Sequence, residues 1–306
     1  MIEIIATAES IAQAKALLDA GIDTLYIGEE EFGLRLPASF SRAEQKEVIE
    51  YAHQKGKKVN IALNAIMHPE KMKQVPEYLD FLTACQPDRI VVGDTGVIQV
   101  LRKGGYPLSF IYDAEILVTN ARQINFWQKK GAVGALLARE VPFEEMKVLA
   151  QQVTIPVEVL VYGATCIHQS KRPLLQNYFN FTGQAEMIDR KRGLFLSEPK
   201  KEETHYSIYE DQHGTHIFAD NDLNLINELS ELYTQGFTTW KLDGLFTPGE
   251  EFIEIAQIFA AAKEALEAGS WSEEQANAAE EKIQLLHPAE RGLDTGFYYL
   301  DPEAIK

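Results

Sequence analysis

Short apolar runs alternate with amphipathic segments along most of the chain. Eight apolar runs have the length and composition of buried strands, at residues 2–6, 24–28, 59–64, 89–93, 108–112, 132–138, 157–161 and 239–242. Helical spacing of apolar positions marks the segments between them, at residues 11–20, 42–55, 75–83, 97–103, 121–130 and 143–152. Ser41 and Gly56 flank the second helical segment as a start and a stop signal. Buried strands separated by helices predict parallel pairing through βα units.

Eight such units predict a TIM-like (β/α)8 barrel, either regular or distorted. A doubly wound sheet is the alternative, because periodicity alone does not show that the first strand meets the last. We expect residues 1–270 to form the barrel domain, and residues 271–306 to form a C-terminal helix and a tail packed on the barrel. The pattern breaks once, at an irregular polar insert at residues 166–218. Within it, residues 205–218 resemble a hairpin with its turn at 211–214.

Composition narrows the class of protein. The chain has 306 residues, 45% of them hydrophobic, and a formal net charge of −17. That charge argues against a free-standing nucleic-acid-binding protein, whose surface should be basic. Two short basic clusters, at residues 55–58 and 190–192, are interpreted as solvated loops. No stretch approaches the roughly 18 apolar residues of a membrane span, and the N-terminus has no basic leader, so we expect a cytoplasmic protein.

Polar residues follow most of the predicted strands, at the ends where a parallel barrel places its chemistry. We therefore expect them to line a cleft that binds and orients a polar substrate. The candidates for catalysis are Asn64, Asp94, Arg139, Glu140 and Asp243, and the candidates for substrate binding are Arg35, Cys166, His168 and Lys241. Glu29 and Asp113 occupy equivalent positions. Arg139 and Glu140 are the strongest pair, because a charged dipeptide directly after an apolar run is costly to place without a partner.

Cys166 has three interpretations. It could be a small buried apolar residue, a nucleophile that needs a base, or a metal ligand that needs further ligands. His168 is two residues away on a predicted loop, where a thiol and an imidazole rarely align. The second cysteine, Cys85, is distant in sequence, so the chain offers neither a disulfide framework nor a self-contained metal site.

The stretch around Cys166, EVLVYGATCIHQSKRPLLQ, resembles the signature of the U-32 peptidase family, the collagenase-like peptidases of unknown catalytic type. Glu158, Gly163, Ala164 and Cys166 match that signature in register. Further stretches are also similar to the family: LLDAGIDTLYIGEEEFGLR, EYAHQKGKKVNIALNAI, RIVVGDTGVI, ILVTN, ALLAREVPFEEM, WKLDGLF and RGLDTGFYYLD. The resemblance covers most of the chain and implies a TIM-like barrel.

The resemblance also implies an iron–sulfur cluster, for which this chain has an incomplete set of ligands. Family members that hydroxylate RNA bases or quinone precursors are understood to hold a [4Fe–4S] cluster on four cysteines. Cys166 matches the first ligand, Pro173 stands at the second, residues 193–199 contain none, and Asn224 stands at the fourth. We therefore expect no metal and no cofactor bound by this chain alone, and a cluster only in a paralogous partner.

In length and insert, the chain most resembles the shorter of two paired family members in Gram-positive bacteria. That pair is linked to 5-hydroxyuridine formation at the wobble position of tRNA. The resemblance implies a subunit that acts beside a longer, cysteine-complete paralogue and meets tRNA through the complex. Two other functions stay open. One is a protease, although no Ser-His-Asp arrangement or HExxH motif is apparent; the other is a non-catalytic barrel that binds a small anion through Arg35, Arg139 and Lys241.

Overall fold

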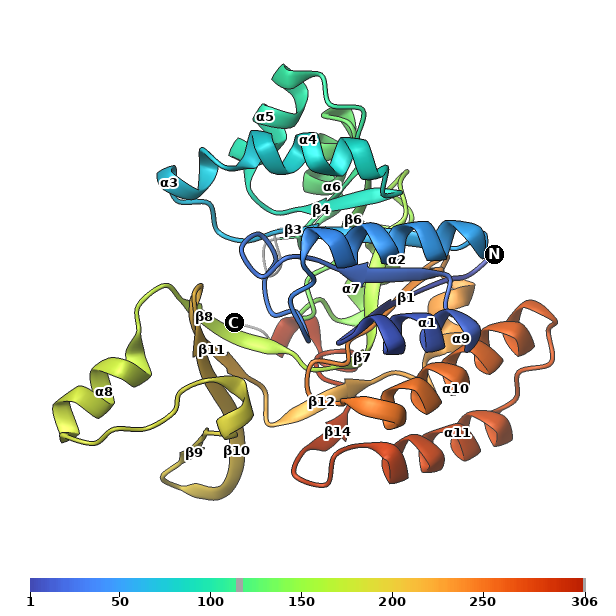
Figure 1. Ribbon diagram of the computed structural model, residues 1–306. Helices are drawn as coiled ribbons and strands as arrows, with labels where there is room; N and C mark the ends of the chain where they lie inside the picture. The colour runs from blue at the N-terminus through green and yellow to red at the C-terminus, as the bar shows by residue number, and fades with distance from the viewer. Residues whose placement is uncertain (114–117, 305–306) are drawn as a thin grey trace.

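Eight parallel strands close into a barrel in the computed structural model, which describes residues 1–113 and 118–304 (Figure 1). They are β1 (Glu3–Thr7), β2 (Thr24–Ile27), β3 (Lys58–Leu63), β4 (Arg89–Val92), β5 (Phe110–Tyr112), β6 (Ala132–Leu136), β7 (Val157–Gly163) and β13 (Thr239–Leu242). Strand β13 pairs in parallel with both β1 and β7, which closes the sheet. The predicted barrel is therefore confirmed, and the doubly wound alternative is excluded.

Helices connect the strands and cover the outside of the barrel. They are α1 (Ile11–Asp19), α2 (Arg42–Gln54), α3 (Pro69–Met72), α4 (Val75–Cys85), α5 (Thr95–Gly104), α6 (Ala121–Lys129), α7 (Phe143–Ala150), α9 (Leu229–Thr234) and α10 (Gly249–Glu267). Local sequence fixes several starts. Ser10, Ser41 and Asn120 each accept a hydrogen bond from the first turn of the helix that follows, and Ser41 and Glu44 form a capping box.

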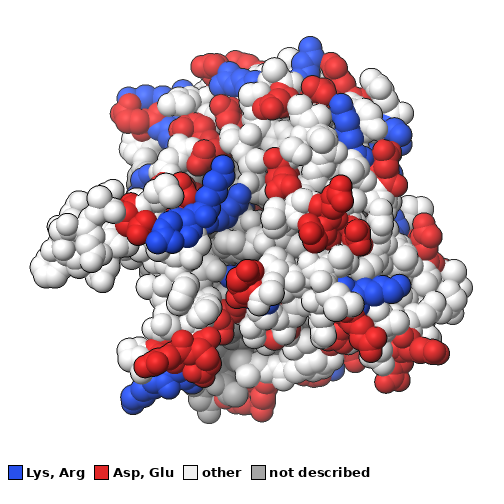
Figure 2. All heavy atoms as spheres, turned by 60° about the horizontal axis from the view of Figure 1, so that its bottom comes forward, with Lys and Arg blue, Asp and Glu red and all other residues white. Residues whose placement is uncertain are grey.

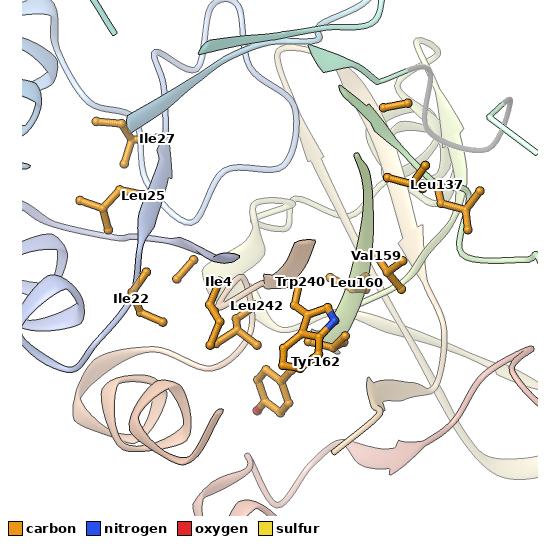
Figure 3. Packing of buried hydrophobic residues seen from close by; sticks show 14 of the residues in the cluster. Ile4, Ile22, Leu25, Ile27, Leu137, Val159, Leu160, Tyr162, Trp240 and Leu242 are labelled. Carbon is orange, nitrogen blue, oxygen red and sulfur yellow. The ribbon is translucent and has the colours of Figure 1, made fainter. Parts of the chain in front are cut away.

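The core has two layers, because side chains alternate between the two faces of each strand. The larger layer fills the space between strands and helices, and Figure 3 shows Ile4, Leu25, Trp240 and Leu242 within it. The smaller layer lies inside the barrel and is made of Ile5, Tyr26, Ala62, Val91 and Ile111. Both faces of the strands are thus buried, which explains their continuous apolar runs.

The insert between β7 and β13 is more regular than its polar sequence suggests. It contains β8 (Cys166–Ser170), α8 (Leu174–Thr182), the 3-10 turn η2 (Arg190–Arg192), β9 (Phe195–Glu198), β10 (Lys201–Asp211) and β11 (Gly214–Phe218). Its four strands form an antiparallel sheet in the order β8-β11-β10-β9. The predicted hairpin is confirmed as β10 and β11, with Asp211 opposite Gly214. Figure 1 shows this sheet and α8 standing to one side of the barrel.

The C-terminal region returns to the barrel. Strand β12 (Asn221–Asn224) runs antiparallel to β7, and β14 (Gly292–Asp294) pairs in parallel with β12. Between them, α11 (Glu273–Leu286) packs beside α10, and η3 (Pro302–Ala304) follows β14. Tyr298 is buried, and its ring stacks on Phe143 of α7 with ring centroids 4.7 Å apart. Among the described residues, no helix is long and apolar enough to cross a membrane.

Candidate functional site at the mouth of the barrel

The polar residues singled out in the sequence follow the carboxyl ends of successive barrel strands. Asn64 follows β3, Asp94 lies two residues beyond β4, Asp113 follows β5, and Asp243 follows β13. Arg139 and Glu140 lie three and four residues beyond β6. Since all carboxyl ends of a parallel barrel emerge on one face, these positions share one mouth. Their side chains, however, make different contacts.

Asn64 and Asp113 form a buried pair at this mouth. The Asn64 side-chain nitrogen Nδ2 donates to Oδ2 of Asp113 at 2.9 Å, and its Oδ1 accepts from the backbone N–H of Leu34 at 2.9 Å. Asp113 is 1% exposed and Asn64 6%. Asp94 instead caps α5, because its carboxylate accepts from the backbone N–H of Gly96. Asn64 and Asp113 are therefore brought together, whereas Asp94 has a local structural contact.

Arg139 and Cys166 lie on either side of a small recess between the ends of β6 and β7. Arg139 Nη1 donates to the carbonyl oxygen of Ala164 at 2.7 Å. The recess, about 10 Å³ in volume, is lined by both residues and by Glu140, whose side chain is exposed. That volume is about enough for one water molecule. The recess therefore marks a rim contact and is too small for a substrate.

The Cys166 thiol is mostly buried and packs with Ala164, Tyr209 and Phe218. It donates to the backbone carbonyl oxygen of His168 at 3.3 Å. The imidazole of His168 is exposed on β8. This hydrogen bond does not itself activate the thiol as a nucleophile, because a backbone carbonyl is not a base that takes up its proton. The geometry supports the interpretation of Cys166 as a buried apolar residue.

Asp243 occupies a tight corner between β13 and β7. Its backbone N–H donates to the Tyr162 carbonyl oxygen at 2.9 Å, and its carboxylate accepts from the backbone N–H of Leu245 at 3.0 Å. A side chain at Gly163 would place Cβ 2.3 Å from the Asp243 carbonyl oxygen, and Gly163 has φ of 120°. Position 163 therefore requires glycine. The Asp243 carboxylate is buried at 8% exposure.

The insert forms one wall of the mouth through contacts with the loop that follows β2. Arg35 Nη1 donates to Oε1 of Gln169 on β8 at 2.7 Å, and Arg190 Nη1 donates to the Leu36 carbonyl oxygen at 3.1 Å. Arg35 is buried and adopts φ of 50°, a left-handed backbone that is unusual for a residue with a side chain. Strained conformations of this kind gather at functional sites. Arg35 is thus the most distinctive of the predicted substrate-binding residues.

Lys241 lies inside the barrel, below the mouth. Its Nζ is 3.8 Å from Oε1 of Glu158 and 3.8 Å from the centre of the Tyr26 ring. Burial raises the pKa of the Glu158 carboxyl group, and the neighbouring Lys241 opposes this shift. Asn60, fully buried in β3, has no hydrogen-bond partner for its side-chain amide among the described residues. The pair of Lys241 and Glu158 was not predicted from the sequence, although Glu158 is a charged residue within the apolar run VEVLV.

The residues at the expected cluster positions do not fit a [4Fe–4S] group, which needs four thiolates. Pro173 precedes α8, and Asn224 on β12 accepts from the backbone N–H of Ile226 at 3.3 Å. Cys85 ends α4 before β4 begins, at the opposite end of the barrel from Cys166. Across residues 1–113 and 118–304, no group of three or more His, Cys, Asp or Glu is placed to hold a metal ion.

Comparison with known proteins assigns the family. The model of peptidase family U32 matches residues 9–306. This chain belongs to peptidase family U32. The U32 stretch at 116–120, ILVTN, lies partly outside the described residues, whereas the stretches around Asn64, Arg139, Cys166 and Asp243 all meet at the mouth.

Two Bacillus subtilis proteins are similar to this chain in sequence, and one solved structure is similar to it in fold. It is 35% identical to tRNA hydroxylation protein P2, over 97% of each chain. It is 25% identical to tRNA hydroxylation protein P1, over 79% of this chain and 58% of the relative. A solved U32 peptidase shares 16% identity with a TM-score of 0.52, covering 79% of this chain and 92% of that one, and supports the barrel fold.

Proposed function

We propose that this chain takes part in the 5-hydroxylation of wobble uridine in tRNA, in the cytoplasm. The observation that carries the proposal is the 35% identity to tRNA hydroxylation protein P2 along nearly the full length of both chains. The match spans 97% of each chain. The barrel, its mouth and the insert are therefore features that the two proteins would share.

Within this function, the chain's own residues suit binding and positioning. The mouth holds a buried arginine with a strained backbone, Arg35, and a hydrogen-bonded pair, Asn64 and Asp113. Such groups orient a polar substrate. Because the chain does not supply four thiolates, the proposal assigns the redox chemistry to a longer U32 paralogue that carries the cluster. Bacillus subtilis also has a longer relative of this chain, P1, of which the match covers 58%.

The insert offers a surface for that paralogue. Helix α8 has no charged residue, and only Leu175 among its nine residues is buried. Phe181 is 91% exposed and Tyr178 58% exposed. Figure 2 shows α8 as an uncharged projection at the left of the molecule. Exposed aromatic side chains of this kind are typical of the centres of protein interfaces.

A peptidase activity is the second candidate, on the strength of the family name alone. The geometry around Cys166 argues against a cysteine peptidase, because its thiol is directed at a backbone carbonyl and His168 is exposed. Casein and gelatin assays on the untagged chain separate the two functions. Cleavage that survives inhibition of contaminating proteases would favour the peptidase.

The test of the proposed function is mass spectrometry of tRNA nucleosides from a strain that lacks this gene. We expect 5-hydroxyuridine and its derivatives to fall, and a plasmid copy of the gene to restore them. Co-expression with the paralogue and size-exclusion chromatography test the partner. If the two proteins elute separately while the deletion still abolishes the modification, the partner part of the proposal fails.

A further inference from the structure

Two neighbouring helices of the barrel's outer layer, α5 and α6, carry a local excess of positive charge. Residues 95–139 contain six lysines and arginines against two acidic residues, a net charge of +4. That leaves −21 for the rest of a chain whose total is −17. Chain order alone obscures this concentration, because strand β5 separates the two helices.

The charges line an open groove between α5 and α6. Two adjoining hollows, of about 520 and 450 Å³, share Arg102 and Lys130. Lys103 lines the first hollow and Lys129 the second. No acidic residue lines either hollow in the part of the chain that the structure describes. The groove is therefore uniformly positive.

These charges also lack the ion pairs that neutralise other basic residues. Within the described chain, no carboxylate lies within 4.0 Å of Arg102, Lys103, Lys129 or Lys130. The cluster at residues 55–58 is different: Lys55 pairs with Asp19 at 3.1 Å, and Lys58 pairs with Glu3 at 3.7 Å. An unpaired surface cation attracts an anion more strongly than a paired one, because no neighbouring carboxylate cancels its field.

An exposed aromatic side chain borders the groove. Phe126 is 49% exposed, and Nζ of Lys130 lies 5.4 Å from its ring centre. Phe126 meets Trp127 edge to face, and Trp127 in turn stacks on Tyr112 with centroids 4.6 Å apart. The stack holds Phe126 in place while leaving its ring accessible. A fixed aromatic face beside cations is the combination that stacks an unpaired base and binds its phosphates.

We propose that the α5–α6 groove docks RNA, with Arg102, Lys103, Lys129 and Lys130 on the phosphodiester backbone and Phe126 against an unpaired base. This inference rests on the proposed function, which makes RNA the substrate. Both helices begin near the mouth and run back along the barrel. A helix of ten residues is about 15 Å long. A tRNA bound along this flank therefore still reaches the mouth.

The test compares two variants, each of which loses three positive charges. The groove variant is Arg102→Gln, Lys129→Gln and Lys130→Gln. The control is Lys15→Gln on α1, Lys46→Gln on α2 and Lys55→Gln at the C-cap of α2. The probe is an unmodified tRNA transcript, bound by the full chain alone and with its paralogue, over a range of salt concentrations. We expect at least about tenfold weaker binding for the groove variant, and a log Kd against log salt slope reduced by about two. The control should stay within about twofold of wild type.

Equal losses in both variants, or unchanged binding by the groove variant, would overturn the inference, as would a wild-type chain and complex that bind no tRNA. If the groove variant keeps its tRNA affinity but no longer co-purifies with the paralogue, the groove is a protein interface and the RNA inference fails. Nucleosides from the deletion strain separate this inference from the proposed function. Loss of tRNA affinity by the groove variant, together with unchanged 5-hydroxyuridine in that strain, would leave the inference standing and reject the function.

Discussion

At the end of β7, Gly163 allows the backbones of two neighbouring barrel strands to approach closely. The Asp243 backbone approaches Gly163 so closely that a methyl group would overlap the Asp243 carbonyl oxygen. The same corner holds β7 and β13 together through the hydrogen bond from Asp243 to Tyr162. Backbone geometry, rather than side-chain chemistry, explains why glycine stands three residues before Cys166.

Gly163→Ala should lower the free energy of unfolding by about 2 to 4 kcal/mol, since it adds both backbone strain and a steric overlap. Gly183→Ala is the matched control. Gly183 also has a positive φ, of 69°, but a methyl group there meets no atom within 4 Å. It should cost only about 1 kcal/mol. Urea unfolding measures both, and equal costs would contradict the account of this corner.

The Glu158–Lys241 pair shows what the sequence could and could not reveal at single positions. Lys241 was expected to bind substrate, as one of three residues that could supply positive charge for a small anion. Its position in the pleat directs it into the barrel instead, toward Glu158 and Tyr26. Which way a residue points in a short strand depends on register, and register is fixed by neighbouring strands that are distant in sequence.

Lys241→Met should destabilise the protein by about 3 to 5 kcal/mol at pH 8, because it leaves a buried carboxylate unpaired. The loss should shrink at pH 5. A carboxyl group with a raised native pKa favours the folded state at low pH and loses that contribution as pH rises through the native pKa. Adding Glu158→Gln should recover most of the stability at pH 8. A loss that is equal at both pH values would contradict this.

At the scale of elements, the insert and the outer helices were predicted to different extents. The hairpin of β10 and β11 was predictable because its turn, Asp211 to Gly214, is a local signal. Strand β8 was not, since it pairs with β11 more than forty residues away along the chain. The groove between α5 and α6 was missed for the same reason. The two basic clusters visible in the sequence were interpreted as solvated loops, and Lys55, Lys58 and Arg192 prove to be ion-paired.

The aromatic residues of the insert divide into buried and exposed side chains. Tyr209 belongs to a small core beneath the sheet, whereas Tyr178 and Phe181 are exposed. Tyr178→Ser with Phe181→Ser should therefore abolish co-elution with the longer paralogue without lowering stability. Val148→Ser with Leu285→Ser is the control, because both side chains are exposed and lie on other elements, α7 and α11. Co-elution that persists in the α8 variant would mean that the partner binds elsewhere.

At the scale of the whole molecule, the eight-stranded barrel followed from periodicity, whereas the metal content depends on individual ligands. The anaerobically purified chain should be colourless and contain no stoichiometric iron, because only one cysteine stands at the four expected positions. The cysteine-complete paralogue, purified in the same way, is the positive control. A broad absorbance with about four irons per chain would show that the chain holds a cluster by other ligands.

The central claim is that this barrel, through its mouth, takes part in tRNA hydroxylation. The most direct measurement is the 5-hydroxyuridine content of tRNA in a deletion strain carrying wild type, Arg139→Gln or the control Lys282→Gln, at matched protein levels. Arg139 spans the ends of β6 and β7, whereas Lys282 is exposed on α11. We predict that wild type and Lys282→Gln restore the modification, and that Arg139→Gln leaves the 5-hydroxyuridine content at least about tenfold lower. Full modification without this gene, or with Arg139→Gln, would contradict the claim.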